Sequence, residues 1–325
     1  MKFSLIFLLL FAMWGCDSAA HQAAIVEIEE LGGIVNSTEN NSGSPAIEVR
    51  FTNVSDARLE HLKGLTNLQR LDLSNTKVSD TGLEHLKGMT NLQRLFLGGT
   101  KVSDTGLESL KGVTSLQQLI LDNTEITNTG LEHLKGMTAM QVLNLNKTEI
   151  TDAGLEHLKG LTSLQRLDLS STKVSDVGLE HLKELTSLQV LDLENAKVIG
   201  TGLEHLKGLT SLQQLILDNT EITDAGLESL KELTSLQRLY LSNTGISDAG
   251  LEHLKGMTSL QHLILRNVDI TDTGLEHLKG MTNLRLLDLF RTKVTYEGWK
   301  KIRQALPDCN IQPEAFPINN DTNTD

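Results

Sequence analysis

The sequence predicts an α/β solenoid, in which like units stack side by side instead of closing around one compact core. The first observation is a 24-residue unit, residues 65–88, and the other two are the strand pattern and the helix pattern inside it. Ten units fill residues 65–304. The later copies follow without insertion or deletion and begin at residues 89, 113, 137, 161, 185, 209, 233, 257 and 281.

Each unit contains one strand and one short helix. In the first unit, Leu71-Asp72-Leu73 alternates apolar and polar residues, as a strand with one buried face does. Asp80, followed by leucines three and six residues later, predicts a short helix with Asp80 as N-cap and Gly88 as the glycine after its C-terminus. One unit buries too few apolar side chains to fold alone. Neighbouring units must therefore pair their strands in one parallel sheet and join their leucines in a shared core.

The consensus LxxLxLxxTxΦ[ST]DxGLxxL resembles that of the leucine-rich repeat family over residues 65–304. It is similar in particular to ribonuclease-inhibitor-like and F-box-associated repeats. The resemblance implies a leucine-rich repeat horseshoe, with the parallel sheet on the concave face and the short helices on the convex face.

Two columns of the unit carry further predictions. Threonine, first Thr76, stands where that family usually has Asn or Cys, and we expect its hydroxyl to bond backbone groups in the turn after each strand. Ala196 and Val268 should interrupt this ladder. Gly82 recurs in all ten units, either because adjacent turns approach closely there or because recent duplication preserved a neutral residue.

The composition describes an acidic protein with an aliphatic interior. The formal net charge is −13 at pH 7, and aromatic residues make up 3% of the chain. An acidic surface repels phosphate backbones, so nucleic acid is not expected as a partner. Cys16 and Cys309 are the two cysteines and stand at opposite ends of the solenoid, which excludes a disulfide framework.

Residues 1–15 have the pattern of a signal peptide, because Lys2 precedes an apolar run that is too short for a transmembrane helix. The four residues that end at Cys16, MWGC, resemble a bacterial lipobox. This resemblance implies that Cys16 is lipidated and that residues 16–22 form a tether. Multiple acyl chains would anchor the protein to a membrane of the cell envelope, on the periplasmic or outer face. The alternatives are secretion without lipidation of Cys16, and an uncleaved anchor.

The solenoid needs a cap at each end, because a terminal unit would otherwise expose its leucines. Residues 23–64 predict the N-terminal cap, with a helix, a strand at 34–35 and a degenerate first repeat over 41–64. Residues 305–325 predict a C-terminal cap strand that contains Ile311, followed by a disordered tail.

No catalytic or metal-binding constellation stands out. Eight histidines form one column on the predicted helices, and such a line could bind metal or sense pH. A line on a convex surface does not converge on an ion, so a solvated face copied with the unit is the simpler explanation. No nucleophile–base pair or phosphate loop is visible either, and we expect no enzymatic activity, cofactor or metal. The column consists of His61, His85, His133, His157, His181, His205, His253 and His277.

Ligand recognition is expected at positions that vary between units. If the strand leucines face inward, the position between them lies on the concave surface. There, Phe96 and Ile120 form a first pad, and Ile216, Tyr240 and Ile264 a second pad, with an acidic band between them. Such anchors rimmed by Arg and polar groups suit protein binding; the alternative is that β-favouring residues simply accumulated at exposed strand positions. The predicted ligand-binding residues are Phe96, Ile120, Ile216, Arg238, Tyr240, His262, Ile264 and Arg266.

Two functions fit these observations. In the first, a membrane-tethered monomer binds a protein or an envelope ligand on its concave face, and the chain resembles bacterial leucine-rich repeat lipoproteins. In the second, it is a substrate adaptor of a ubiquitin ligase, as F-box repeat proteins are. That family carries an N-terminal three-helix module, and the stretch between Cys16 and the first cap strand is too short for one. The scaffold is therefore the preferred function.

Overall fold

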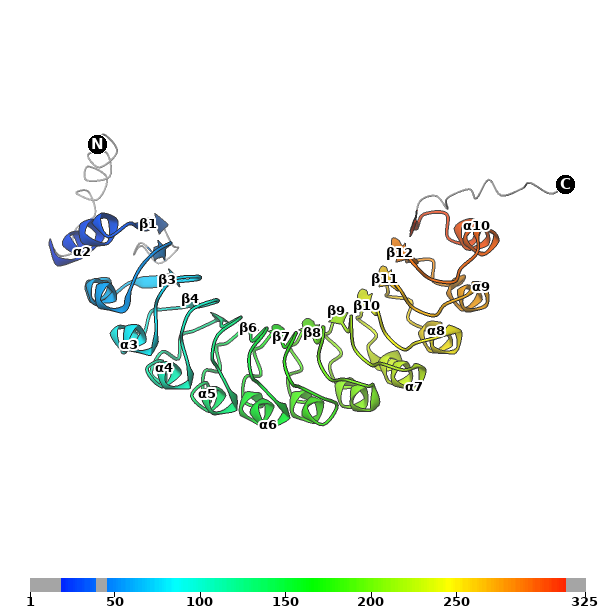
Figure 1. The fold of residues 1–325 in the computed structure, drawn as a ribbon, viewed down its shortest axis with the longest axis horizontal. Helices are drawn as coiled ribbons and strands as arrows, with labels where there is room; N and C mark the ends of the chain where they lie inside the picture. Colours follow the sequence, from blue (N-terminus) through cyan, green and yellow to red (C-terminus); the bar gives the residue numbers. More distant parts are fainter. Residues whose placement is uncertain (1–18, 39–45, 314–325) are drawn as a thin grey trace, which may run out of the picture.

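A computed structural model describes residues 19–38 and 46–313. They form one arc, with the strands along its inner curve and the helical turns along its outer curve (Figure 1). Within these two ranges, thirteen strands make a single sheet in chain order, so the predicted horseshoe is confirmed. The predicted signal peptide, the predicted lipidation site at Cys16 and the predicted tail after residue 313 lie outside the described residues.

The repeats supply one strand each, and most of these strands are three residues long. Short strands suffice because the next unit completes their hydrogen bonds. The strands are β1 (Gly33–Thr38), β2 (Ala46–Phe51), β3 (Leu68–Asp72), β4 (Arg94–Phe96), β5 (Gln118–Ile120), β6 (Val142–Asn144), β7 (Arg166–Asp168), β8 (Val190–Asp192), β9 (Gln214–Ile216), β10 (Arg238–Tyr240), β11 (His262–Ile264), β12 (Leu286–Asp288) and β13 (Asn310–Gln312).

Short α-helical and 3₁₀ segments return the chain along the outer curve (Figure 1). They are α2 (Ala19–Glu30), η1 (Asp56–Gly64), α3 (Asp80–Leu83), η2 (Glu84–Leu86), α4 (Asp104–Glu108), α5 (Asn128–Glu132), α6 (Asp152–Leu155), η3 (Glu156–Leu158), η4 (Gly178–Leu182), η5 (Thr201–Leu206), α7 (Asp224–Leu227), η6 (Glu228–Glu232), α8 (Asp248–Leu254), α9 (Asp272–Leu275), η7 (Glu276–Leu278) and α10 (Tyr296–Ala305).

From β2 onward the strands run parallel, and from β3 onward each residue pairs with the one 24 positions further along the chain. Leu71 pairs with Leu95, and Leu95 with Leu119. The first pair differs, because β1 and β2 are antiparallel. A direct return of the chain allows an antiparallel pair, whereas a parallel pair needs a crossover such as the helical turn of each repeat.

The interior is one continuous aliphatic core that runs through all repeats. Leu71 and Leu95 are both 0% exposed, as is the second strand leucine, Leu73. Each strand therefore presents its leucines to the space between the sheet and the helical turns, and neighbouring units share that space. This confirms the predicted shared interior.

The threonine column bonds as predicted. Thr76 donates its hydroxyl to the carbonyl of Leu73 at 2.6 Å and so closes the turn after β3. Ala196 and Val268 are buried at the same position without a hydroxyl, which interrupts the ladder in two repeats. The same bond, to the carbonyl three residues earlier, is made by Thr100, Thr124, Thr148, Thr172, Thr220, Thr244 and Thr292.

The aspartate at the start of each helical turn has a different role from the predicted N-cap. Ser79 occupies the N-cap position, and Asp80 is the first helical residue. The Asp80 carboxylate accepts the backbone N–H of Ser103, at 2.7 Å, and its hydroxyl, at 2.6 Å, both in the next repeat. Asp80 therefore joins two repeats, and the N-cap prediction was wrong because the carboxylate is drawn to donors in the neighbouring unit.

The glycine column allows this link. A Cβ atom at Gly106 would lie 2.5 Å from Oδ1 of Asp80, and one at Gly82 would lie 2.5 Å from Oδ1 of Asp56. These contacts are shorter than Cβ atoms normally make, so the predicted close approach of adjacent turns is confirmed. A side chain here would have to displace a carboxylate that is bonded to the next repeat, and glycine avoids this.

Two repeats depart from this aspartate link. In one, Asn128 replaces the aspartate and still bonds Thr151; in the other, Ile199 and Gly200 replace the usual Ser/Thr-Asp pair. Gly200 has a φ of 115°, and Asp176 accepts the backbone N–H groups of Ile199, Gly200 and Gly202. Thr223, in the next repeat, faces no carboxylate, and its N–H donates to the carbonyl of Ile199 at 3.4 Å.

The left-handed glycine predicted at Gly88 is confirmed, but most later repeats do not share it. Of the glycines after the helical turns, Gly88 and Gly136 have positive φ, whereas Gly112 and Gly160 do not. Every repeat instead uses a left-handed residue in the turn after its strand. These residues are Asn75, Gly99, Asn123, Lys147, Ser171, Asn195, Asn219, Asn243, Asn267 and Arg291.

Both ends of the arc are closed by helices. At the N-terminal end, α2 buries Ile28 in the core, and His61 of η1 contacts Glu27 at 2.8 Å. At the C-terminal end, α10 buries Ile302, and burial raises the pKa of the Cys309 thiol to about 11. None of the helices in the described ranges has the length and apolar character needed to cross a membrane.

Candidate ligand-binding surface

Three lines of side chains cross the strands on the inner curve, between and beside the buried leucines. We name them the entry, middle and exit columns, in the order in which each strand motif meets them. The entry column is Arg70, Arg94, Gln118, Val142, Arg166, Val190, Gln214, Arg238, His262 and Leu286. The middle column is Asp72, Phe96, Ile120, Asn144, Asp168, Asp192, Ile216, Tyr240, Ile264 and Asp288. The exit column is Ser74, Gly98, Asp122, Asn146, Ser170, Glu194, Asp218, Ser242, Arg266 and Phe290.

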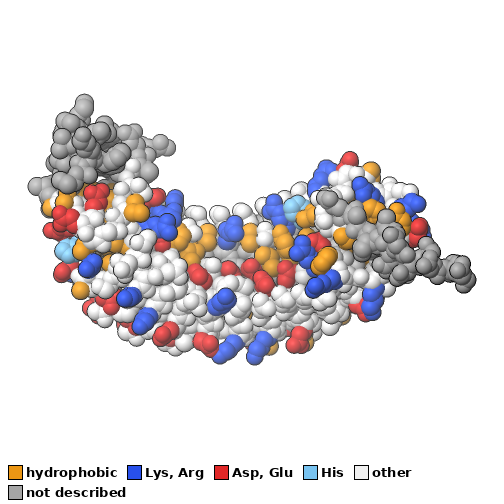
Figure 2. Space-filling model, turned by 45° about the horizontal axis from the view of Figure 1, so that its top comes forward, with side chains coloured by type: hydrophobic (Ala, Val, Ile, Leu, Met, Phe, Trp, Pro, Cys, Tyr) orange, Lys and Arg blue, Asp and Glu red, His pale blue; other side chains and the backbone are white. Residues whose placement is uncertain are grey.

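The second pad is one continuous surface. Ile216 is the register partner of Tyr240, and Tyr240 is the register partner of Ile264, so the three side chains lie on adjacent strands of the middle column. All three are partly buried. Figure 2 shows apolar side chains gathered along the hollowed inner curve. The structure therefore brings together the three residues of the predicted pad.

The first pad is smaller and partly covered. Phe96 and Ile120 are register partners on β4 and β5. The guanidinium of Arg70 lies 4.5 Å from the centre of the Phe96 ring, a cation–π contact that occupies part of the pad.

The predicted flanking residues of the second pad differ in whether they are already engaged in an ion pair within the chain. Arg238 and His262 are neighbours in the entry column. Burial, with a smaller contribution from the Arg238 charge, lowers the pKa of His262, so its imidazole is neutral at pH 7. Arg266 is tied down, because its Nε lies 2.6 Å from Oδ2 of Asp288, a carboxylate that is 2% exposed. At the other end of the middle column, Nε of Arg50 lies 3.7 Å from Oδ2 of Asp72.

Sequence reasoning missed a hollow of about 380 Å³ between the two pads. It crosses β5 to β9, and the valines of the entry column line it together with members of the middle column. Reading the entry column as a second variable line would have found them. Its lining includes Ile120, Val142, Arg166, Asp168, Val190, Asp192 and Ile216.

The acidic side chains of the hollow repel one another. Burial raises the pKa of Asp192 to about 6, and the neighbouring charges of Asp168, Glu194 and Asp218 add to this rise. The backbone N–H of Glu194 opposes it by donating to Oδ1 of Asp192 at 2.9 Å. Burial also raises the pKa of Asp218. This part of the surface therefore holds negative charge that the chain leaves poorly compensated.

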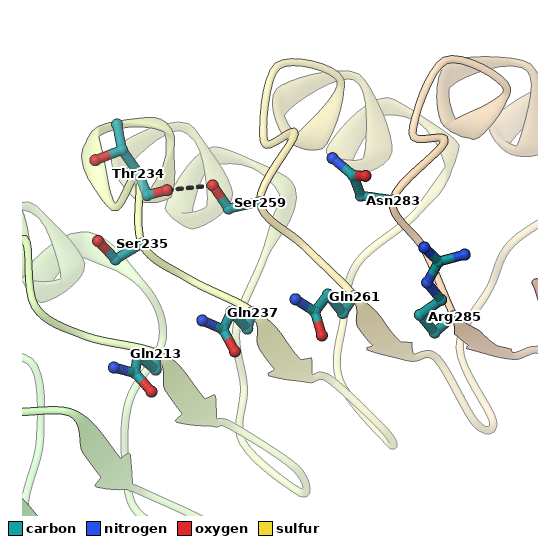
Figure 3. Close-up of a pocket in the computed structure, with 8 residues that line it drawn as sticks. All are labelled: Gln213, Thr234, Ser235, Gln237, Ser259, Gln261, Asn283 and Arg285. Atoms are coloured by element: carbon teal, nitrogen blue, oxygen red, sulfur yellow. Dashed lines mark hydrogen bonds between the residues drawn. The ribbon is translucent and has the colours of Figure 1, made fainter.

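A second hollow, of about 490 Å³, lies where the chain enters β9 to β12 (Figure 3). Its lining is polar, and the Ser259 hydroxyl donates to the carbonyl of Thr234 across it. Gln237 and Gln261 extend in parallel from successive repeats in Figure 3. The residues that line it are Gln213, Thr234, Ser235, Gln237, Ser259, Gln261, Asn283 and Arg285. It adjoins the entry column beside the second pad.

The histidine column lies on the outer curve, and Nδ1 of His133, His157 and His181 is buried without a hydrogen-bond partner. Within residues 19–38 and 46–313, no three His, Cys, Asp or Glu side chains are grouped in a way that could hold a metal ion.

The comparisons with known families agree with the geometry. Models described as leucine-rich repeats match residues 66–112, 114–174, 162–222, 232–255 and 256–279, which together amount to more than half of the chain. No curated protein matches the sequence.

Several solved structures share the fold. An internalin from Listeria monocytogenes is 20% identical with a TM-score of 0.59, and the match covers 92% of this chain and 96% of that one. The plant peptide hormone receptor RGFR1, solved in complex with RGF2, is 19% identical with a TM-score of 0.54. The ectodomain of the receptor kinase GASSHO1/SCHENGEN3 from Arabidopsis thaliana is 17% identical with a TM-score of 0.52. Both plant matches cover 78% of this chain, which spans 40% and 33% of those receptors.

Proposed function

Because this chain belongs to the leucine-rich repeat family, we propose that it is a non-enzymatic scaffold that binds a protein ligand on its concave face. The observation that carries the proposal is the second pad, where Ile216, Tyr240 and Ile264 lie side by side on three adjacent strands. Apolar anchors of this kind, surrounded by polar and charged residues, supply most of the energy of protein recognition.

Two structures with the same fold support a protein or peptide ligand. RGFR1 was solved with RGF2, and the Arabidopsis ectodomain with CASPARIAN STRIP INTEGRITY FACTOR 2. The adaptor alternative has less support, because the described residues before β1 form one helix, α2, which packs on β1 and η1 as a cap. The helical turn of each repeat supports the ribonuclease-inhibitor-like subtype.

We further propose that the protein is exported as a monomer and held at the cell envelope by a lipid on Cys16. The support is the pattern of residues 1–16 in the sequence. Metabolic labelling with an alkyne fatty acid tests this directly: the label should appear on the wild type and be lost from Cys16→Ser. Labelling that is equal in both proteins would reject lipidation at this residue.

The binding proposal is tested with the two tyrosines of the chain. A partner captured from envelope extracts by the full chain should bind Tyr240→Ala at least about tenfold more weakly, because truncating an anchor at the centre of a pad removes a hot spot. Tyr296→Ala is the matched control, since Tyr296 lies at the start of α10, away from the sheet face. Unfolding midpoints of both variants exclude a general loss of structure.

The proposal fails if Tyr240→Ala retains the wild-type affinity while it is folded. It also fails if Tyr296→Ala weakens binding as much, because the partner would then contact the C-terminal cap and not the concave face.

A further inference from the structure

The hollow between the two pads combines apolar walls with acidic groups. Ile120 and Val142 lie on one side of it, and Val190 and Ile216 on the other. Asp168 and Asp192, which are register partners on β7 and β8, lie between these walls.

Each of the two carboxylates has one oxygen engaged within the chain. Oδ1 of Asp168 accepts the N–H of Ser170 at 2.9 Å, and Oδ1 of Asp192 accepts the N–H of Glu194 at 2.9 Å. In the part of the chain that the structure describes, Oδ2 of both residues accepts no hydrogen bond, and neither residue forms an ion pair. Two carboxylates, each with one oxygen that accepts no hydrogen bond, thus line this apolar-walled hollow.

We propose that this hollow receives a single lysine or arginine side chain from an extended segment of the protein ligand. The apolar walls would contact the methylene stem, and the two free carboxylate oxygens would accept hydrogen bonds from the charged head. The proposal rests on the proposed function, because it names the chemistry of the ligand that the concave face binds.

The distance between the two pads sets how far apart the apolar residues of the ligand segment should be. Ile120 and Ile216 are four strands apart, which corresponds to about 19 Å at ~4.8 Å per strand. An extended peptide rises about 3.3 Å per residue, so roughly six residues cover this distance. The ligand segment should carry apolar residues about six positions apart, with the basic residue between them.

The surrounding charges favour one basic residue over a basic tract. Arg166 lines the hollow, and Arg94 and Arg238 stand in the same entry column. Glu194 and Asp218 stand in the exit column near Asp192, and their charges act on it and add to the negative charge of this region. A ligand with several adjacent lysines would place some of them against these arginines, at a cost in affinity.

The test uses a library of random dodecapeptides displayed on phage and selected on the purified full chain. We expect enriched peptides to carry one Lys or Arg between apolar residues. A synthetic peptide from the selection should lose affinity at least tenfold when its basic residue is replaced by norleucine, and by a similar factor on Asp168→Asn/Asp192→Asn. The matched control is Glu221→Gln/Asp269→Asn, which removes two exposed acidic charges outside the hollow and should leave the affinity unchanged.

The outcomes separate this inference from the proposed function. Peptides that bind the Asp168→Asn/Asp192→Asn variant as well as the wild type, yet lose affinity on Tyr240→Ala, overturn the inference and leave the concave-face scaffold standing. Peptides indifferent to all of these variants, or a selection without enrichment, count against both. The norleucine peptide requires no change to the protein, so a folding defect in a variant cannot decide the result.

Discussion

Asp192 lies near the centre of the arc, where burial raises its pKa to about 6 from an ordinary value of 3.8. Between these two pH values the folded chain holds a proton that the unfolded chain has released. The contribution of this residue to stability is therefore greatest below pH 3.8 and is lost as the pH rises through 6.

Asp192→Asn should therefore stabilise the protein at pH 7.5, by about 1 kcal/mol once screening by solvent is allowed for. The gain should shrink at pH 4, where the folded wild type already carries the proton. Urea unfolding at the two pH values measures the difference. An equal gain in stability at both pH values would show that burial of the charge is not the cause of the gain.

Gly106 is the clearest position at which a single Cβ atom would disturb the fold. The atom would lie 2.5 Å from Oδ1 of Asp80, whose carboxylate is fixed by two bonds to Ser103. We expect Gly106→Ala to lower the free energy of unfolding by about 1–3 kcal/mol, as overpacking does. Gly112→Ala is the control, because nothing lies within 4 Å of the added atom. Equal stability of the two variants would contradict a packing role for the glycine column.

At this scale the sequence predicted the buried and the hydroxyl-bearing positions well, because each follows from its place in the unit. It predicted less at positions where the neighbouring repeat sets the hydrogen-bond partner or the backbone conformation. Asp80 has the sequence context of an N-cap but bonds the next repeat, and Lys147, Ser171 and Arg291 adopt positive φ without the usual Asn or Gly. Val142 and Val190 are ordinary strand residues in sequence, and the curvature of the sheet makes them walls of a hollow.

Among the elements, the link between helical turns decides how strongly neighbouring repeats are joined. Asp224 accepts the N–H and the hydroxyl of Ser247, each at 2.7 Å, whereas Gly200 offers Thr223 no carboxylate. At the boundary between the turns η5 and α7, the Thr223 N–H therefore donates to a backbone carbonyl at 3.4 Å, and the two bonds to a carboxylate that Ser247 makes have no equivalent.

Asp224→Gly should destabilise the protein by about 1.5–3 kcal/mol, the range for hydrogen bonds to a charged group, because it removes both bonds to Ser247. Gly200→Asp should not restore the missing link, because Gly200 has a φ of 115° and a Cβ atom there would lie 2.8 Å from the Cα of Gly226. Urea unfolding measures the stability of both variants, and amide hydrogen exchange across residues 224–250 locates the effect of Asp224→Gly. If Asp224→Gly leaves exchange at its boundary unchanged, the link does not hold the repeats together.

Over the whole molecule, the sheet has one register from β3 to β12, and the interval between partners is 24 residues. The period and the strand and helix patterns inside the unit predicted this parallel sheet, because like units that each carry one strand and one return turn pair their strands in chain order. The antiparallel start at β1 was not predicted, since β1 lies outside the repeat and its direction does not follow from the repeat pattern.

Deletion of residues 137–160, one complete unit with β6 and α6, should leave a folded arc that is shorter by one strand. The two pads would move closer by about 4.8 Å, and a ligand that spans both should bind at least tenfold more weakly. Circular dichroism checks the fold, and titration with a peptide that binds the wild type checks the affinity. Deletion of residues 65–88 is the control: it removes Arg70 from beside Phe96 but no pad residue, and it leaves the distance between the pads unchanged, so binding should not weaken. Comparable binding by both shortened proteins would show that the span between the pads is irrelevant.

The ion pairs near the two ends of the arc affect how a charged partner associates with the protein. Asp72 and Asp288 are matched by Arg50 and Arg266, whereas the aspartates midway along the curve have no such counter-ion within the described ranges. The field that an approaching cation senses is thus focused on the middle of the crescent, where the walls also concentrate field lines. Capture should begin there and proceed outward to the apolar anchors, at a rate that slows as ionic strength rises.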